Sequence, residues 1–237
     1  MNILNELTAG NLLAIVFLIL IEGILSLDNA IALAALVRSR LKNVEDQRKA
    51  LTYGIWGAYF FRTVVVFIGV WLMECWWIKF LAGVYLVWLG ISELLPKALK
   101  TEEKELTGFN WKWLSPLWAT IISVEIMDIA FSIDSIGVAL AISNVKWVLI
   151  AGAILGILMM RIAANLFINL IGRYPILEKT AFVLVLIAGI GVSLKAFDIE
   201  IPEVPFIATL LAILFLSIYC NHMYPSRINK FLEKYYG

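Results

Sequence analysis

The chain has 237 residues, of which 62% are hydrophobic and 16% are charged, and its mean hydropathy is +0.91. Soluble globular domains are nearer half apolar and a quarter charged, so this composition argues against a water-soluble enzyme. The formal net charge of +1 gives no overall field that would draw the chain to nucleic acid. Two cysteines without a CxxC spacing and a single histidine predict neither a disulfide framework nor a zinc site.

Apolar stretches fill most of the chain. A membrane-spanning helix needs about 20 predominantly apolar residues. The stretches that meet this length, or nearly so, are Leu12–Val37, Leu51–Met73, Phe80–Leu99, Leu117–Ser143, Val148–Ile171, Ala181–Ala196 and Pro205–His222. They predict an all-α membrane bundle of seven transmembrane helices, organised as a single transport domain over residues 1–237. The first stretch contains an Asp and follows no Lys or Arg, so we do not expect a cleavable signal peptide.

The basic residues indicate an orientation in the cell membrane. Lys and Arg concentrate in the connections after the first, third and fifth stretches and in the C-terminal tail. The intervening connections carry only Lys79, Lys146 and Lys195. Because cytoplasmic loops collect Lys and Arg, this pattern predicts an N-terminus outside the cell and a C-terminus in the cytoplasm.

Two segments of the chain repeat each other. The string EGILSLDNA at residues 22–30 and the string DIAFSIDSI at 128–136 carry an acid, a serine, an acid and a small polar side chain at the same offsets. The next helix of each half carries a glycine followed five residues later by an arginine, as Gly57 with Arg62 and Gly156 with Arg161. Three helices are an odd number, so the second unit enters the membrane in the opposite direction. The pattern predicts inverted repeats, 12–99 and 117–196, with an extra helix at 205–222.

Five acidic residues lie within these apolar stretches. They are Glu22, Asp28, Glu125, Asp128 and Asp134. One Asp at the centre of a membrane helix costs roughly 2.5–3.5 kcal/mol, so these acids need a partner, water or a metal ion. One alternative is purely structural: Arg62 and Arg161 would neutralise two acids and leave three unexplained.

Helical geometry separates the acids of each motif. Glu22, Ser26 and Asn29 share one stripe of a helix, and Glu125, Asp128, Ser132 and Ser135 share another. On an ideal helix, Asp28 and Asp134 point away from these stripes. Either each helix is broken near its Ser-x-Asp step, or the second Asp faces a different part of the cavity. A break would also free backbone carbonyl groups as ligands.

The donor atoms of these motifs are all hard oxygens. Carboxylates, the amide of Asn29 and the hydroxyls of Ser26, Ser132 and Ser135 suit Mg, Ca or Mn rather than Cu(I) or Zn. We expect Glu22, Asp28, Asn29, Glu125, Asp128 and Asp134 to be metal ligands, supported by the serines, Arg62 and Arg161. A metal-free set of five acids and two arginines would take up protons, which favours exchange of protons for metal.

The strings EGILSLDNAIA (22–32) and EIMDIAFSIDSIGVALAIS (125–143) resemble the two signature segments of the TerC family of integral membrane proteins. The resemblance covers essentially the full chain and is closest in type to shorter bacterial members of the YkoY/YjbE kind. It implies manganese(II) efflux, with Glu22, Asp28, Asn29, Glu125, Asp128 and Asp134 in the matching acidic positions.

Several alternatives stay open at this point. The chain could carry another divalent cation, such as calcium or magnesium, or act as a non-transporting membrane partner in metallation or insertion of exported proteins. An intramembrane aspartyl protease is disfavoured because the GxGD pattern is absent, so we expect no enzyme. We expect Glu93 to pair with a lysine at the interface, and Asn165 and Asn169 to form interhelical hydrogen bonds. A homo-oligomer is compatible with the sequence.

Overall fold

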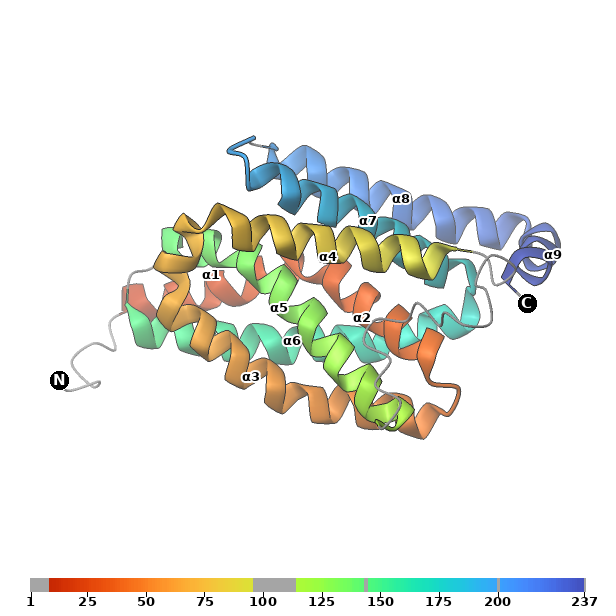
Figure 1. Cartoon of the computed structure of the whole chain (residues 1–237), viewed down its shortest axis with the longest axis horizontal. Helices are drawn as coiled ribbons and strands as arrows, with labels where there is room; N and C mark the ends of the chain where they lie inside the picture. Colours follow the sequence, from red (N-terminus) through yellow and green to blue (C-terminus); the bar gives the residue numbers. More distant parts are fainter. Residues whose placement is uncertain (1–8, 96–113, 143–144, 200, 237) are drawn as a thin grey trace.

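The computed structural model of the chain describes residues 9–95, 114–142, 145–199 and 201–236. This part of the chain is all-helical and contains nine helices (Figure 1). Their bounds are α1 Ala9–Leu25, α2 Leu27–Arg40, α3 Val44–Glu74, α4 Trp76–Leu94, α5 Pro116–Ile142, α6 Lys146–Arg173, α7 Ile176–Lys195, α8 Glu203–Met223 and α9 Pro225–Tyr236.

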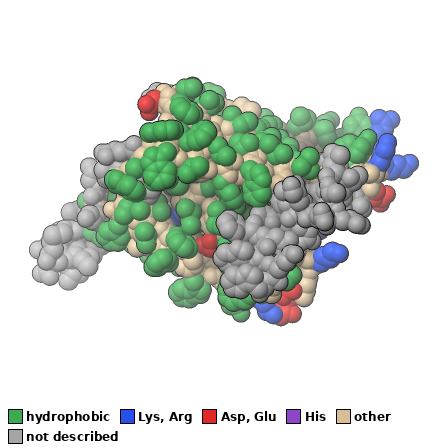
Figure 2. Space-filling view, viewed as in Figure 1, with side chains coloured by type: hydrophobic (Ala, Val, Ile, Leu, Met, Phe, Trp, Pro, Cys, Tyr) green, Lys and Arg blue, Asp and Glu red, His purple; other side chains and the backbone are tan. Residues whose placement is uncertain are grey.

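The described residues of each apolar stretch lie on helices, apart from Ser26, Leu95 and Ala196, and the first stretch is divided between α1 and α2. Among the described residues, five segments are long and apolar enough to cross a membrane, namely α4, Pro116–Ile133 of α5, Trp147–Arg173 of α6, α7, and Pro205–Met223 of α8. The helices α1, α2 and α3, which the seven-helix prediction includes, are not among them. Large apolar side chains cover much of the face seen in Figure 2. Trp56 of α3 is 73% exposed and Leu166 of α6 is 65% exposed, as expected for a surface that faces lipid.

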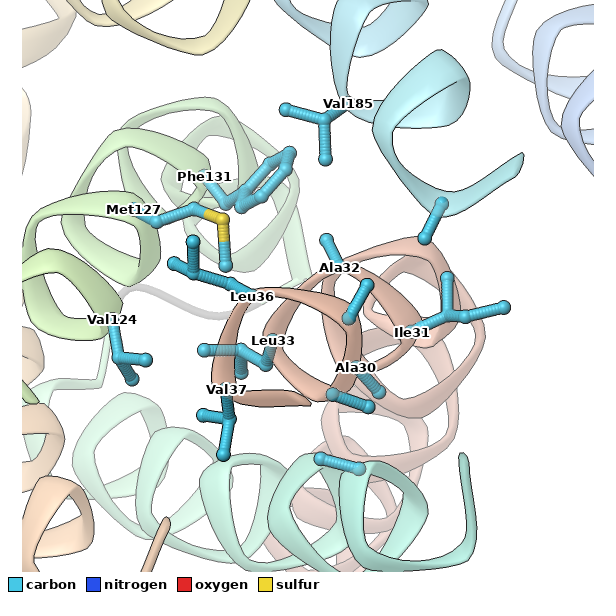
Figure 3. Close-up of a cluster of buried hydrophobic side chains, with 14 of the residues drawn as sticks. Ala30, Ile31, Ala32, Leu33, Leu36, Val37, Val124, Met127, Phe131 and Val185 are labelled. Carbon is cyan, nitrogen blue, oxygen red and sulfur yellow. The ribbon is translucent and has the colours of Figure 1, made fainter. Parts of the chain in front are cut away.

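Helix α2 forms the centre of the bundle. Every side chain from Ala30 to Val37 is fully buried, because α2 packs against α5, α6 and α7 at once. Figure 3 shows Leu36 of α2 beside Met127 of α5, with Phe131 of α5 next to Met127. Met127 is therefore a packing residue of the core.

The remaining helices are arranged around this centre. Helix α1 packs along α6, α3 packs along α5 and α6, and α4 packs along α7. Helix α8 packs mainly on α7 and forms the outer edge of the bundle (Figure 1). Its Phe215, Leu216 and Tyr219 are exposed.

Glycines bring α4 and α7 into close backbone contact. A Cβ atom on Gly83 would lie 2.6 Å from the backbone nitrogen of Ser193 and 2.7 Å from the carbonyl oxygen of Gly189. A Cβ atom on Gly189 would lie 2.7 Å from the backbone nitrogen of Val87. These distances leave no room for a methyl group, so both positions require glycine for the observed packing.

One helix boundary differs from the prediction, and one helix was not predicted. Helix α4 ends at Leu94, where Leu95 becomes extended, whereas the apolar stretch runs on to Leu99. Pro96 follows directly, and the residue before a proline disfavours helical backbone. Helix α9 occupies part of the C-terminal tail, for which the sequence of apolar stretches predicts no helix.

Candidate functional site

The first acidic motif lies at a break between two helices. Helix α1 ends at Leu25 and α2 begins at Leu27, with Ser26 between them at φ −97° and ψ 9°. Asp28 therefore sits in the first turn of α2, where its Oδ1 accepts the backbone N–H of Asn29 at 2.9 Å. The N-terminus of α2 carries partial positive charge, which favours an acid at this position.

The second acidic motif lies on an unbroken helix. Helix α5 continues from Pro116 to Ile142 through Ser132 and Asp134. The helix is therefore broken in the first motif, as one of the two alternatives predicts, and continuous in the second motif. A broken helix supplies backbone groups only in the first motif.

Glu125 and Arg161 form a buried ion pair between α5 and α6. Arg161 Nη2 lies 3.3 Å from Glu125 Oε1 and donates a second hydrogen bond to the carbonyl oxygen of Gly54 in α3 at 3.2 Å. Arg161 is 1% exposed and Glu125 is 7% exposed. Buried charges are costly unless they are paired, so each group stabilises the other in this position.

Glycines of α3 make room for this ion pair. A Cβ atom on Gly54 would lie 2.8 Å from Glu125 Oε1, and one on Gly57 would lie 2.6 Å from Oε2. The predicted Gly57–Arg62 spacing therefore serves two purposes. Gly57 faces the Glu125 carboxylate, and Arg62 lies further along α3 beside Asp128.

Asp128, Arg62 and Ser132 form a second buried cluster. Arg62 donates to the Ser132 hydroxyl from Nε at 3.2 Å and from Nη2 at 2.8 Å, and its Nη2 lies 3.7 Å from Asp128 Oδ1. Ser132 in turn donates to the carbonyl oxygen of Asp128 at 2.7 Å. The structure thus places each helix-embedded arginine beside an acid of α5, as the structural alternative predicts.

Among the described residues, five buried side-chain oxygens accept no hydrogen bond, and three of them belong to predicted metal ligands. These three are Asn29 Oδ1, Glu125 Oε2 and Asp128 Oδ1. They come from α2 and α5, which pack against each other. All three are hard donors of the kind that Mg²⁺, Ca²⁺ and Mn²⁺ prefer.

Some predicted ligands lie outside the described side chains. The backbone of Glu22 belongs to α1 and that of Asp134 and Ser135 to α5, but their side chains are not described. Within the described side chains, no group of three or more His, Cys, Asp or Glu residues is placed to hold a metal ion. The six-residue ligand set thus stays a prediction.

Glu93 forms the expected ion pair, but with an arginine at the end of α2 rather than with a lysine. Arg40 Nε lies 3.4 Å from Glu93 Oε1, and Arg40 Nη1 donates to the Ser123 hydroxyl at 2.5 Å. Lys179 Nζ donates to the backbone carbonyl of Glu93 at 3.0 Å. The predicted side-chain pairing of Glu93 with a lysine is therefore corrected to Arg40, because Lys179 caps the end of α4 instead. An acid near the end of an apolar stretch and a basic residue at the end of another were the available signals.

The two asparagines of α6 also differ from the prediction. Asn165 and Asn169 are exposed, and Asn165 Nδ2 donates to the carbonyl oxygen of Arg161 in its own helix at 3.1 Å. Their spacing of four residues places both on the same outward face of α6, away from the interhelical contacts that we expected.

Comparison with known proteins agrees with this architecture. Residues 7–229 match the model of the integral membrane protein TerC family. The membrane protein YceF of Bacillus subtilis (strain 168) is 40% identical over 208 residues, covering 87% of this chain and 80% of YceF. YkoY of the same organism is 35% identical over 198 residues, covering 77% of this chain and 59% of YkoY.

A more distant relative has a name that describes a membrane-bound redox modulator. It is Alx of Escherichia coli (strain K12), 25% identical over 230 residues, covering 85% of this chain and 70% of Alx. No solved structure matches the chain. The extent of the family match and the identity to YceF establish that the chain belongs to the TerC family of integral membrane proteins.

Proposed function

We propose that the chain is a secondary transporter that exports manganese(II) from the cytoplasm through an acidic site inside the bundle. The observation that carries this proposal is the burial of Glu125 and Asp128 in a helix long and apolar enough to span a membrane, each with an oxygen that accepts no hydrogen bond from a described residue. Asp128 Oδ1 also lies 3.7 Å from Arg62 Nη2, whereas Glu125 Oε2 has neither a hydrogen bond nor an ion pair with a described residue. Buried acids within membrane-spanning helices are a feature of ion pathways. Membership of the TerC family supports a membrane role of this kind.

In this proposal the bundle consists of two inverted repeats. Helices α1, α2, α3 and α4 form the first repeat, and helices α5, α6 and α7 form the second. Helices α1 and α2 pack on α6 just as α5 packs on α3. Helix α2 packs on α7 as α5 packs on α4. These two sets of contacts are interchanged when the halves are exchanged, and α8 lies outside the repeat. The seven membrane crossings that follow include the broken α1–α2 pair and α3.

The orientation proposed is an external N-terminus and a cytoplasmic C-terminus in the cell membrane. The ends of α2 and α4 and the start of α7 meet in the Arg40–Glu93–Lys179 cluster, so the basic connections lie at one end of the bundle. Figure 2 shows blue side chains gathered at that same end. This gathering supports the assignment of that end to the cytoplasm.

Proton exchange provides a means of driving the export. An acid released from a divalent cation in a low-dielectric interior takes up a proton more readily than in water. Arg62 and Arg161 each already lie beside one acid of α5, which reduces the charge that the transported ion must balance. Hard oxygen donors leave Ca²⁺ and Mg²⁺ as alternative cargo, which competition distinguishes.

A thiol-based redox role is less well supported. Cys75 and Cys220 are the two cysteines of the chain, and both are free. Cys75 directly precedes the start of α4. Cys220 lies near the end of α8, and this end of α8 lies beside the start of α7, because Ser217 forms a hydrogen bond with Thr180. Because α4 ends where α7 begins, the two thiols lie at opposite ends of the bundle.

Flux measurements in proteoliposomes test the proposal. Purified protein is reconstituted around an encapsulated dye that manganese quenches, and Glu125→Gln, Asp128→Asn and Asp28→Asn are compared with wild type. Glu45→Gln is the matched control, since the Glu45 side chain is 70% exposed at the start of α3. We expect quenching by wild type and the control, and its loss in the site variants.

Two further arms of this experiment refine the result. Excess Ca²⁺ or Mg²⁺ that abolishes the quenching would identify that ion as cargo, and an imposed pH gradient that accelerates it would support proton exchange. Wild-type protein without flux, or site variants that transport as well as Glu45→Gln while eluting as folded protein, would overturn the proposal.

A further inference from the structure

Helix α9 has two chemically different faces. At 100° per residue, Ile228, Phe231, Leu232 and Tyr235 form one continuous apolar stripe. The opposite side carries the basic residues Arg227, Lys230 and Lys234, together with Glu233. A helix with an apolar stripe and a basic face fits the boundary between water and the acyl chains of a bilayer.

The apolar stripe of α9 is only partly covered by the bundle. Phe231 is 50% exposed and Tyr235 is 43% exposed, and their rings lie 4.9 Å apart. The helix packs mainly on the end of α8. An exposed apolar surface of this kind is typical of a site that contacts a membrane or another protein.

The connection to α8 sets the position of this surface. Helix α8 ends at Met223, and Tyr224 changes the chain direction with φ −129° and ψ 51°. Figure 1 shows α9 nearly end-on beside the end of α8, which runs across the view. Helix α8 is long and apolar enough to cross a membrane. Helix α9 therefore begins where that span leaves the bilayer, and its axis is turned away from the axis of α8.

Charge favours one occupant of this surface. The described part of α9 carries three basic residues and one acidic residue, and the exposed Lys42 and Arg48 lie at the same end of the bundle, where Lys49 is already paired with Glu45. Figure 2 shows blue side chains at this end. Basic residues next to a membrane span attract anionic phospholipids, and the apolar stripe matches the acyl region below the headgroups.

We infer that α9 is an interfacial helix that binds anionic phospholipid. Its Phe231 and Tyr235 face enters the boundary of the acyl chains, while Arg227, Lys230 and Lys234 contact the negative headgroups. This lipid contact anchors the end of α8 and does not depend on which ion the bundle carries.

Site-directed spin labelling of the full chain tests this inference. Cys75 and Cys220 are replaced by serine, and a nitroxide is attached to cysteine in Tyr235→Cys or Glu233→Cys. The protein is placed in nanodiscs of phosphatidylcholine, with or without phosphatidylglycerol. Accessibility to oxygen reports lipid exposure, and accessibility to a nickel chelate reports water exposure.

We expect the label at 235 to favour oxygen and the label at 233 to favour nickel. Phosphatidylglycerol should raise the oxygen-to-nickel ratio at 235 roughly twofold or more. Lys230→Gln with Lys234→Gln should remove this rise, whereas Lys49→Gln in α3 should preserve it.

Two outcomes would overturn the inference. Equal nickel accessibility at both positions would place α9 in water. Shielding of position 235 from both reagents would show that protein covers the stripe, either a second copy of this chain or another partner.

Discussion

The guanidinium of Arg161 depends on a single carboxylate for its neutralisation among the described residues. Glu125 supplies that charge, and Gly54 supplies one carbonyl oxygen. Removing one partner of a buried ion pair leaves the other charged and unpaired, at a cost of about 3–5 kcal/mol. The contribution of this ion pair to folding stability can therefore be measured separately from the proposed transport.

We predict that Glu125→Gln lowers the thermal stability of the purified protein by a free energy of about 3–5 kcal/mol. The amide retains the shape of the side chain but removes the negative charge beside Arg161. Thermal unfolding in detergent measures the effect. The double variant Glu125→Gln with Arg161→Gln should recover part of the loss, and a single variant as stable as wild type would contradict the prediction.

The space beside Gly57 allows a second prediction. A Cβ atom on Gly57 would lie 2.6 Å from Oε2 and 2.7 Å from Cδ of Glu125, so Gly57→Ala must displace the carboxylate. We expect a loss of about 1–3 kcal/mol in stability, as for overpacking in a core. Gly23→Ala is the control, since its Cβ would have no described atom within 4 Å. Comparable melting temperatures for the two variants would refute the proposed constraint.

The sequence identifies the buried acids but only part of their pairing. The cost of burying charge predicts that Arg62 and Arg161 can neutralise acids, and the structure places both beside α5. The repeat aligns Glu22 with Asp128, so it gives Glu125 no counterpart in the first motif and no basis for choosing its partner. That choice depends on how α5 and α6 each pack against α3, which the sequence pattern does not specify.

At the scale of elements, the contact between α4 and α7 is set by glycine. We predict that Gly83→Ala and Gly189→Ala each lower stability by about 1–3 kcal/mol or more, because the added methyl group meets backbone atoms rather than a movable side chain. Thermal unfolding with size-exclusion chromatography measures the effect.

Gly172→Ala provides a matched control for these helix substitutions. Its Cβ would lie 3.4 Å from Arg38 Nη1, an ordinary contact with a flexible side chain. Alanine is also favoured over glycine in a helix by roughly 0.5–1 kcal/mol. A stability loss at Gly172 equal to that at Gly83 would indicate a general intolerance of α-helical substitutions and would contradict the proposed close contact.

Most elements could be predicted because a membrane helix needs a long apolar run. The break at Ser26 could be foreseen only as one of two choices, since the positions of Glu22 and Asp28 are incompatible with one stripe but do not decide how the backbone resolves this. Helix α9 was missed because its apolar residues recur with helical periodicity rather than forming a run.

At the scale of the whole molecule, the proposed orientation predicts which connections face each side of the membrane. In a chain whose native cysteines are replaced by serine, Lys79→Cys should react with a membrane-impermeant maleimide in intact cells. Lys42→Cys should react only after the membrane is permeabilised. Lys79 lies near the start of α4 and Lys42 between α2 and α3, at opposite ends of the bundle. Labelling of both positions in intact cells would contradict the orientation.

The break at Ser26 has a consequence for turnover. A transporter has to release its ion as well as bind it, and a site lined only with acids would bind a dication too tightly for rapid release. The start of α2 contributes a fixed partial positive charge beside Asp28 that no change of pH removes. In the proposed transporter, this fixed charge would weaken the attraction of Asp28 for a dication and so shorten the time that the ion stays bound.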